Sequence, residues 1–429
     1  MKLSNAPFYL TLISGVLPLF AAFFDSKFFV YLPFMLTAIA LLLFWFANQG
    51  VTQRVSAGMV ALLLFLLAHG VGTGLTIGHG SLGLLGLVLT SMIYVQLFNS
   101  AGTSLDPGKL VNQLAIVYLL HMAYLFLELF LKFVGYQDLL LSLFGAAKNV
   151  TKMKNYNSAA FLQVLGFPDG FFGLNGMLLG SQSAGQVMVC AFIVSALWYK
   201  YSPLKGAKQW IFNAVALFAF LCAVNMTMVL TLAMVCLLMI YVIPFSRMKK
   251  TAIQLIVPLG VMSFFSAVAA LLFYRLSNYD SDVEIYAKAF RAPVETFFDF
   301  TLWELMFGLG RTEVRADAAD FGLAMLASQV GFVFMVVVGL VLGNILISAL
   351  RETRRVASWG ASLSLTEKKW LWLATVNALI SFVFAMGLVH YTPSVELGGL
   401  QMFAFSIALT IISVRNLRSF RHPPVIKGI

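Results

Sequence analysis

Long runs of apolar residues, separated by short polar stretches, dominate the pattern of the chain. A helix needs about 20 apolar residues to cross about 30 Å of hydrocarbon, and on that scale the chain holds about 12 candidate spans. They lie near residues 7–24, 29–47, 57–76, 82–98, 113–134, 183–199, 210–223, 226–243, 252–273, 321–350, 370–388 and 400–414. The pattern predicts an all-α, polytopic integral membrane protein, with residues 1–429 forming a single membrane-embedded domain.

Three of the runs need a decision about their limits. The run over 210–243 would measure about 51 Å as one helix at 1.5 Å per residue, which is too long for one crossing. We divide it near Asn225-Met226-Thr227, where polar groups can face the far interface. The long run at 321–350 predicts a helix that tilts or projects beyond the membrane. The run at 7–24 is followed by further spans, so we interpret it as an uncleaved first span and not as a signal peptide.

Composition supports the membrane class. Of the 429 residues, 61% are hydrophobic and 10% are charged, whereas about 25% are charged in ordinary soluble domains. One soluble core cannot bury so much apolar surface, but a bilayer accepts apolar side chains on the outside of a bundle. The three cysteines lie in apolar runs at spacings that suit neither a metal site nor a disulfide framework.

The distribution of Lys and Arg predicts the orientation. With the N-terminus inside, the cytoplasmic segments hold 18 of the 28 basic residues and only three of the 17 acidic residues. The net charge of +11 is therefore a topology signal, and we expect no nucleic-acid partner. Both termini are predicted to be cytoplasmic. The outer segments are then 135–182, 274–320 and 389–399, and their aromatic and leucine content predicts short helices at the outer interface.

The second outer segment carries a group of arginines. Arg311 and Arg315 are four residues apart, directly after the turn Gly308-Leu309-Gly310, so in a helix both would project from one face. Guanidinium groups suit phosphate oxygens and stay charged at physiological pH. Arg275 and Arg291 are further candidates for binding an anionic substrate. The alternative is that Arg311 and Arg315 pair with nearby acids in a solvated loop, namely Glu313, Asp317 and Asp320.

Other candidate residues lie at or near the outer ends of spans. His390 begins the last outer segment, where it could serve as a base near neutral pH or as an interfacial hydrogen-bonding residue. Glu128 lies inside the fifth span, and Lys132 one turn later favours a structural ion pair over a proton relay. The glycines of the first outer segment predict a small-residue stripe, with a re-entrant segment as the alternative. They are at positions 166, 170, 173, 176, 180 and 185.

Several of these features together resemble a known family. The turn Phe307-Gly308-Leu309-Gly310 is followed by ADAADFGLAMLASQVG at Ala316–Gly331, which leads into a long apolar span. This pattern, the outer segment between the ninth and tenth spans, and His390 resemble the O-antigen polymerase and ligase superfamily of GT-C membrane glycosyltransferases. Asp320-Phe321-Gly322 is similar to the polymerases. The ligases tend to carry a His-Asn pair there, which this chain lacks.

The resemblance implies a function at the periplasmic face of the bacterial inner membrane. The expected reaction polymerises oligosaccharide repeat units linked to undecaprenyl pyrophosphate, without a metal or other cofactor. His390 is the expected base, Asp320 an alternative base or an orienting group, and the four arginines bind pyrophosphate. Expected partners are the lipid-linked oligosaccharides, membrane lipids, and a chain-length regulator and flippase of the same pathway. The alternatives are a ligase that transfers polymer to lipid A–core and, in another class, a lipid flippase or transporter.

Overall fold

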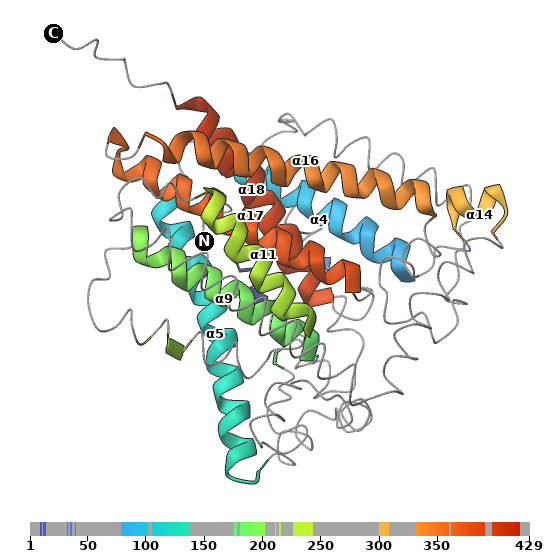
Figure 1. The fold of residues 1–429 in the computed structure, drawn as a ribbon, viewed down its shortest axis with the longest axis horizontal. Coiled ribbons are helices and arrows are strands. Elements are labelled where there is room, and N and C mark those ends of the chain that lie inside the picture. The colour runs from blue at the N-terminus through green and yellow to red at the C-terminus, as the bar shows by residue number, and fades with distance from the viewer. Residues whose placement is uncertain are drawn as a thin grey trace.

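The computed structural model describes about half of the chain. The described residues are 9–10, 12–13, 32, 35–36, 39, 79–101, 105–136, 176–177, 181–201, 211, 214–215, 226–242, 300–308, 331–359, 362–390 and 397–420. Within these ranges the regular structure is entirely helical and contains no strand (Figure 1). The helices are α4 (His79–Ala101), α5 (Pro107–Phe133), α9 (Ser181–Tyr201), α11 (Met226–Val242), α14 (Leu302–Phe307), α16 (Phe332–Ala357), α17 (Leu365–His390) and α18 (Leu397–Ser419).

The lengths and composition of these helices agree with a helical membrane protein. Four described helices are long and apolar enough to cross a bilayer, over Pro107–Leu131, Phe332–Ala357, Leu365–Gly387 and Gly399–Ser419. Shorter apolar helices cover Gly86–Asn99 and Ala184–Leu197. Several other predicted spans fall wholly or largely outside the described residues, at 7–24, 29–47, 57–76, 210–223 and 252–273.

The predicted span at 321–350 begins later in the structure than the hydropathy pattern indicated. α16 starts at Phe332, and Gly331 is its N-cap, with φ 87° and ψ 149°. Residues with a side chain rarely adopt this positive φ, and it cannot continue a right-handed helix. One continuous helix over 321–350 is therefore wrong, because the backbone changes direction at Gly331.

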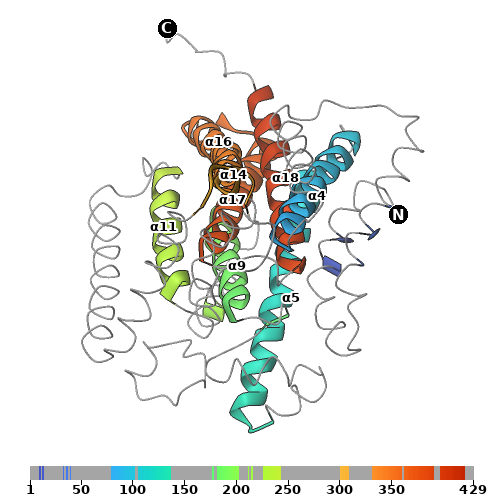
Figure 2. The same ribbon diagram turned by 90° about the vertical axis from the view of Figure 1, so that its right-hand side faces the viewer.

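α17 lies at the centre of the described helices. It contacts α5, α9, α11, α16 and α18, and Figure 2 shows it between α11 and α18. Every residue of α17 from Trp370 to Ser381 is buried, as is every residue of α18 from Leu400 to Thr410. Helices that are apolar on all sides need neighbours on all sides, so α17 and α18 form the core against which the other helices pack.

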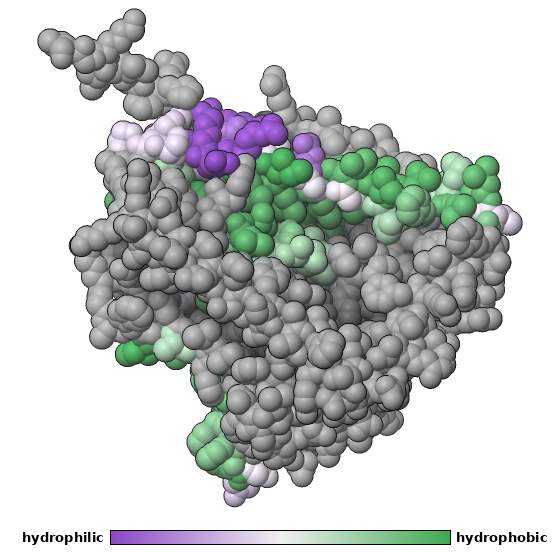
Figure 3. All heavy atoms as spheres, in the orientation of Figure 1, coloured by the Kyte–Doolittle hydropathy of each residue, from purple (hydrophilic) through white to green (hydrophobic). Residues whose placement is uncertain are grey.

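α16 lies at the outside of this core. Phe334, Val338 and Ala349 are buried, whereas Leu340 is 68% exposed and Ile347 is 57% exposed. Figure 3 shows apolar side chains along this helix and hydrophilic side chains gathered at one of its ends. Large exposed apolar side chains on a span are those that face lipid in a membrane protein.

Several buried polar side chains in the core find partners within or between helices. The hydroxyl groups of Thr375 and Thr410 donate to carbonyl groups one turn earlier in their own helices. Between helices, Ser381 and Ser406 are joined by a hydrogen bond of 2.9 Å. The Tyr94 hydroxyl donates to Gln401 Oε1 at 2.6 Å, which joins α4 to α18. Such bonds are needed because hydrocarbon offers no alternative partner to a polar group.

The C-terminal ends of α4, α16 and α18 meet in a basic cluster. Arg355 binds Glu352 Oε2 at 2.7 Å and also donates to the Leu417 carbonyl at 3.2 Å, so it stabilises the end of α18. Arg418 reaches the same Glu352, and Arg415 donates to Asn99 on α4. These residues come from segments that the charge pattern predicts on a single side of the membrane.

Two more helices begin near this cluster, each with a sequence signal for a helix start. α17 follows a capping box in which Glu367 N–H donates to Ser364 Oγ and Ser364 N–H donates to Glu367 Oε2. α5 begins at Pro107, and Asp106 Oδ1 accepts from Gly108 N–H at 2.8 Å. A Cβ on Gly108 would meet Lys369 Nζ, so the starts of α5 and α17 are adjacent. Predicted cytoplasmic helix ends therefore meet in space.

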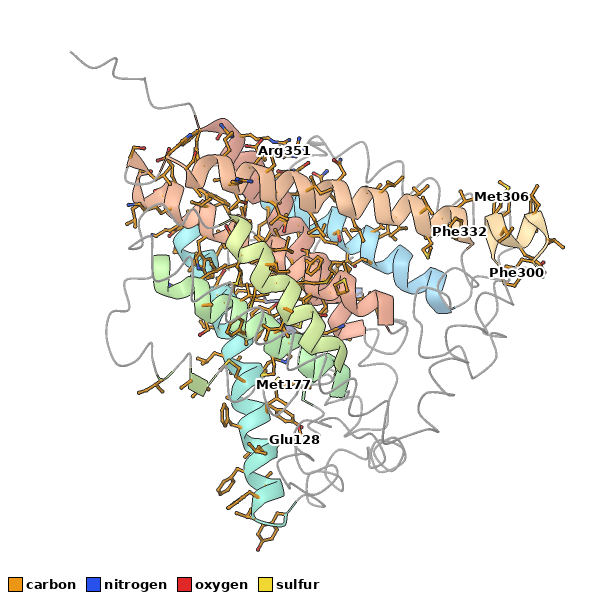
Figure 4. The ribbon with its side chains drawn as sticks, in the orientation of Figure 1. Glu128, Met177, Phe300, Met306, Phe332 and Arg351 are labelled. Atoms are coloured by element: carbon orange, nitrogen blue, oxygen red, sulfur yellow. The ribbon has the colours of Figure 1, made fainter. Side chains whose placement is uncertain are left out.

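α16 is long enough for its two ends to reach opposite boundaries of a bilayer. From Phe332 to Leu350 the helix is mostly apolar and carries no charged residue. At 1.5 Å per residue this stretch is about 29 Å long, close to the roughly 30 Å of a hydrocarbon core. α14 contacts the Phe332 end of α16, so it lies at the boundary opposite the basic cluster (Figure 4).

The bond between α4 and α18 can be tested with Tyr94→Phe. This variant keeps the edge-on contact between the Tyr94 and Phe405 rings and removes only the hydroxyl group. We expect a loss of about 0.6–2 kcal/mol, the range for hydrogen bonds between membrane helices, measured as a lower apparent melting temperature in detergent. Tyr136 is 63% exposed, so Tyr136→Phe is the matched control and should melt with the wild type. Equal melting of all three proteins would contradict the assigned bond.

Candidate functional site

The side chains of the predicted site residues lie outside the described part of the structure, which instead shows segments next to several of them. Five of them lie outside the described residues, namely Arg275, Arg291, Arg311, Arg315 and Asp320. His390 is the last residue of α17, which is the position predicted for it, at the end of a span. The segment that carries Arg311, Arg315 and Asp320 is bracketed by described residues on both sides, Gly308 and Gly331. The structure therefore shows where this segment begins and where it ends, and these two points are called its roots.

The first root is α14, a short helix with a complete capping box. Thr301 Oγ1 accepts from Glu304 N–H at 3.3 Å, and Glu304 Oε2 accepts from Thr301 N–H and from the Thr301 hydroxyl, both at 2.8 Å. The Trp303 and Phe307 rings pack at 4.3 Å between centroids. An isolated helix of six residues would not be stable in water, so the cap and its contact with α16 hold α14 in place.

The capping box also shifts the pKa of Glu304. The Thr301 backbone N–H, and then its hydroxyl, stabilise the carboxylate and lower its pKa from the usual value of 4.5. Because the folded-state pKa is the lower one, this contribution is complete above the pKa of the unfolded chain. It is lost as the pH falls through the folded-state pKa. The cap of α14 is therefore intact at neutral pH.

The second root is Gly331, which contacts α14 directly. A Cβ built on Gly331 would lie 2.2 Å from the Met306 carbonyl oxygen and 2.8 Å from Phe307 N. Gly308, at the end of α14, also has a positive φ of 74° and is buried. The chain thus leaves at Gly308 and returns at Gly331 with the two roots in backbone contact. Only glycine permits both the positive φ and the close approach.

Chain length limits how far the first arginine can be from this contact. Arg311 is the third residue after Gly308, and an extended chain covers at most about 3.6 Å per residue. The Cα atom of Arg311 therefore lies within about 11 Å of the Gly308 Cα atom, and that of Arg315 within about 25 Å. These limits hold for any conformation of the connecting residues. Chain length therefore ties Arg311 to the end of α14, whatever course the connecting residues take.

A second polar feature joins α5 to the first outer segment. Glu128 is 4% exposed, and its Oε2 accepts from Gly176 N–H at 2.9 Å. Figure 4 shows Glu128 beside Met177, the residue after Gly176. The predicted pairing of Glu128 with Lys132 stays a prediction, since the Lys132 side chain is outside the described residues. The partner at Gly176 was not predicted, because 48 residues separate the two in sequence.

Gly176 lies in a turn with φ 66°, and not on the face of a helix. A Cβ there would come within 3.2 Å of Ala184 Cβ, at the start of α9. The glycine spacing predicted one continuous helical stripe, and this does not hold at Gly176. The bond to Glu128 instead fixes the chain as it approaches α9.

α9 also approaches α17 closely near His390. A Cβ on Gly387 would overlap the Gln186 side-chain amide, so Gln186 lies directly against the α17 backbone. Gly387 precedes His390 by less than one helical turn. α5, α9 and α17 contact one another in pairs. These three helices therefore bring Glu128, Gln186 and the backbone of His390 to the same end of the bundle.

Comparisons with known proteins identify no family. No protein-family model matches the chain, and a search of curated proteins found no match. The described helices define the class as a helical membrane protein. Among the described side chains, no group of three His, Cys, Asp or Glu could hold a metal ion.

Replacement of Gly331 tests the joint between α14 and α16. Gly331→Ala combines a positive φ with a clash against the Met306 carbonyl, and such backbone strain costs about 1–3 kcal/mol. We expect an apparent melting temperature lower by several degrees. The matched control is Gly339→Ala in the same helix, where a Cβ would meet no atom within 4 Å. If both variants melt like the wild type, Gly331 does not pack against α14 as described.

Proposed function

We propose that the protein polymerises oligosaccharide repeat units carried on undecaprenyl pyrophosphate, at the periplasmic face of a bacterial inner membrane. The proposal includes about 12 spans, a GT-C type of architecture and a chain-length regulator and flippase as pathway partners. The resemblance in the residues from Phe307 to Gly331 is its starting point. The structural observation that supports it most is the joint between α14 and Gly331, at the end of α16 opposite the basic cluster.

The position of this joint matters because of charge. A lipid pyrophosphate in the outer leaflet presents its anionic group at the outer boundary of the hydrocarbon. Arg311 is tethered to that boundary through Gly308, within about 11 Å. Arg351, Arg354 and Arg355 are at the other end of α16 and are too distant to serve the same ligand. The tether of Arg311 to α14 supports its assignment to an outer-leaflet substrate, and the proposal extends that role to Arg275, Arg291 and Arg315.

The reaction requires little covalent participation by the protein. A hydroxyl oxygen of the acceptor repeat unit forms a bond to the anomeric carbon of the donor polymer. The bond from that carbon to the phosphate oxygen breaks, and undecaprenyl pyrophosphate leaves with the electron pair. The acceptor proton passes to His390, with Asp320 as the alternative base or as an orienting group. Arg275, Arg291, Arg311 and Arg315 stabilise the negative charge that grows on the leaving pyrophosphate.

Substitution of the arginines tests this assignment. Removal of one preorganised donor that stabilises developing charge costs about 10²–10³-fold in rate. Arg311→Ala and Arg315→Ala should therefore abolish long polymer in a deletion strain while protein levels in the membrane stay normal. Lys288→Ala, in the same outer segment but without an assigned role, is the matched control and should restore polymer. Normal polymer ladders from both arginine variants would remove the pyrophosphate role from these residues.

Two further measurements separate the proposal from its alternatives. Loss of a polymerase leaves single repeats attached to lipid A–core, whereas loss of a ligase leaves none. A flippase or transporter, unlike a polymerase, forms no glycosidic bond when it is purified and supplied only with lipid-linked repeats. Formation of longer lipid-linked chains by the purified protein alone is the expected result.

A further inference from the structure

An exposed apolar surface covers α14 and the first turns of α16. On α14, Leu302 is 76% exposed, Trp303 58% and Met306 39%. On α16, Phe332 is 49% exposed, Val333 40% and Val336 39%. These six residues are called the α14–α16 surface below. Figure 4 shows Met306 and Phe332 close together, far from Arg351 at the other end of α16.

The depth of this surface identifies what covers it. It lies about 29 Å from Arg351 along α16, so it is at the opposite edge of the hydrocarbon. Tryptophan prefers this boundary, because its ring is apolar while its indole N–H is a hydrogen-bond donor. The surface continues along the exposed apolar face of α16 to Leu340, and the exposed Thr301 marks its polar limit. This combination fits the zone between acyl chains and headgroups.

We propose that the α14–α16 surface binds the outer acyl–headgroup boundary of the bilayer and sets the depth of the two loop roots. A bilayer is favoured over a protein partner because the surface is continuous with the lipid-facing side of α16. α14 ends at Gly308, and Arg311 follows within about 11 Å. Anchoring of α14 therefore holds Arg311 near the plane of the lipid phosphates.

The effect of α14 on the position of Arg311 rests on the proposed function. Leu302, Trp303 and Met306 act through Arg311 and do not touch the reacting atoms. If α14 left the boundary, Arg311 would move away from the pyrophosphate of a membrane-embedded donor. Arg311 would then contribute less both to donor binding and to stabilisation of the developing charge, so kcat/KM for the membrane-embedded donor should fall.

Fluorescence quenching tests the surface without any assumption about activity. The full chain is placed in nanodiscs of phosphatidylcholine and phosphatidylglycerol, with or without bromine at the 6,7 positions of the acyl chains. Subtraction of the Trp303→Phe spectrum isolates Trp303 from the other six tryptophans. We expect brominated lipid to quench the Trp303 signal several-fold more than aqueous iodide does. Quenching mainly by iodide, or by neither agent because protein covers the ring, would overturn the proposal.

Kinetics test the positioning role. Leu302→Asp should lower kcat/KM several-fold for a long-chain polyprenyl donor in nanodiscs. A short-chain, water-soluble donor has no fixed depth, so with it the variant should match the wild type. Leu365 is 66% exposed at the opposite end of the bundle, and Leu365→Asp is the matched control that should behave as wild type.

The possible failures are distinguishable. An equal loss with both donors would refute the positioning role, because depth would then not be the cause. If the wild-type protein transfers no sugar from any donor, the proposed function fails. The quenching result would still decide whether the α14–α16 surface lies in lipid.

Discussion

The cost of placing a charge in hydrocarbon determines the arrangement of this protein. α16 shows the constraint most clearly, because its apolar stretch is about 29 Å long and is bounded by Arg351 at one end and Gly331 at the other. α17 and α18 are packed among apolar neighbours, and several of their buried polar side chains pair within the bundle. The basic ends of several helices then meet on one side, where Glu352 and helix carbonyls bind them. The opposite end of α16 contacts α14, which carries no basic residue.

In the proposed function, the contact of Gly331 with the Met306 carbonyl connects this membrane constraint to the position of the site. It fastens α14 to the end of a span and brings together the two roots of the segment that carries Arg311 and Arg315. A span is a rigid support, whereas a long connecting segment is not. Chemistry on a lipid headgroup requires its charged groups at a defined depth. A short helix fixed to a rigid span, with apolar residues toward the acyl chains, supplies that depth through local packing.

Hydropathy predicted the helical membrane class and the positions of helices such as α17, because apolar surroundings, whether lipid or other helices, select apolar side chains. Hydropathy placed the start of α16 too early, since an apolar run contains no information about the positive φ of Gly331. The Glu128–Gly176 bond depends on tertiary packing, which periodicity along one helix does not reveal. The capping box at Thr301 and Glu304 could have been found from its T-x-x-E spacing. Arg275, Arg291, Arg311, Arg315 and Asp320 remain predictions, while His390 ends α17 as expected.

The most direct test asks on which side of the membrane the arginine segment lies. Thr312 is next to Arg311, and Ser358 is exposed at the basic end of α16. Single cysteines at these two positions, with the native cysteines replaced, can be labelled with a membrane-impermeant maleimide. Intact cells should label Thr312→Cys, and Ser358→Cys should react only after the membrane is opened. Labelling of Ser358→Cys but not Thr312→Cys in intact cells would place the arginines in the cytoplasm and contradict the account.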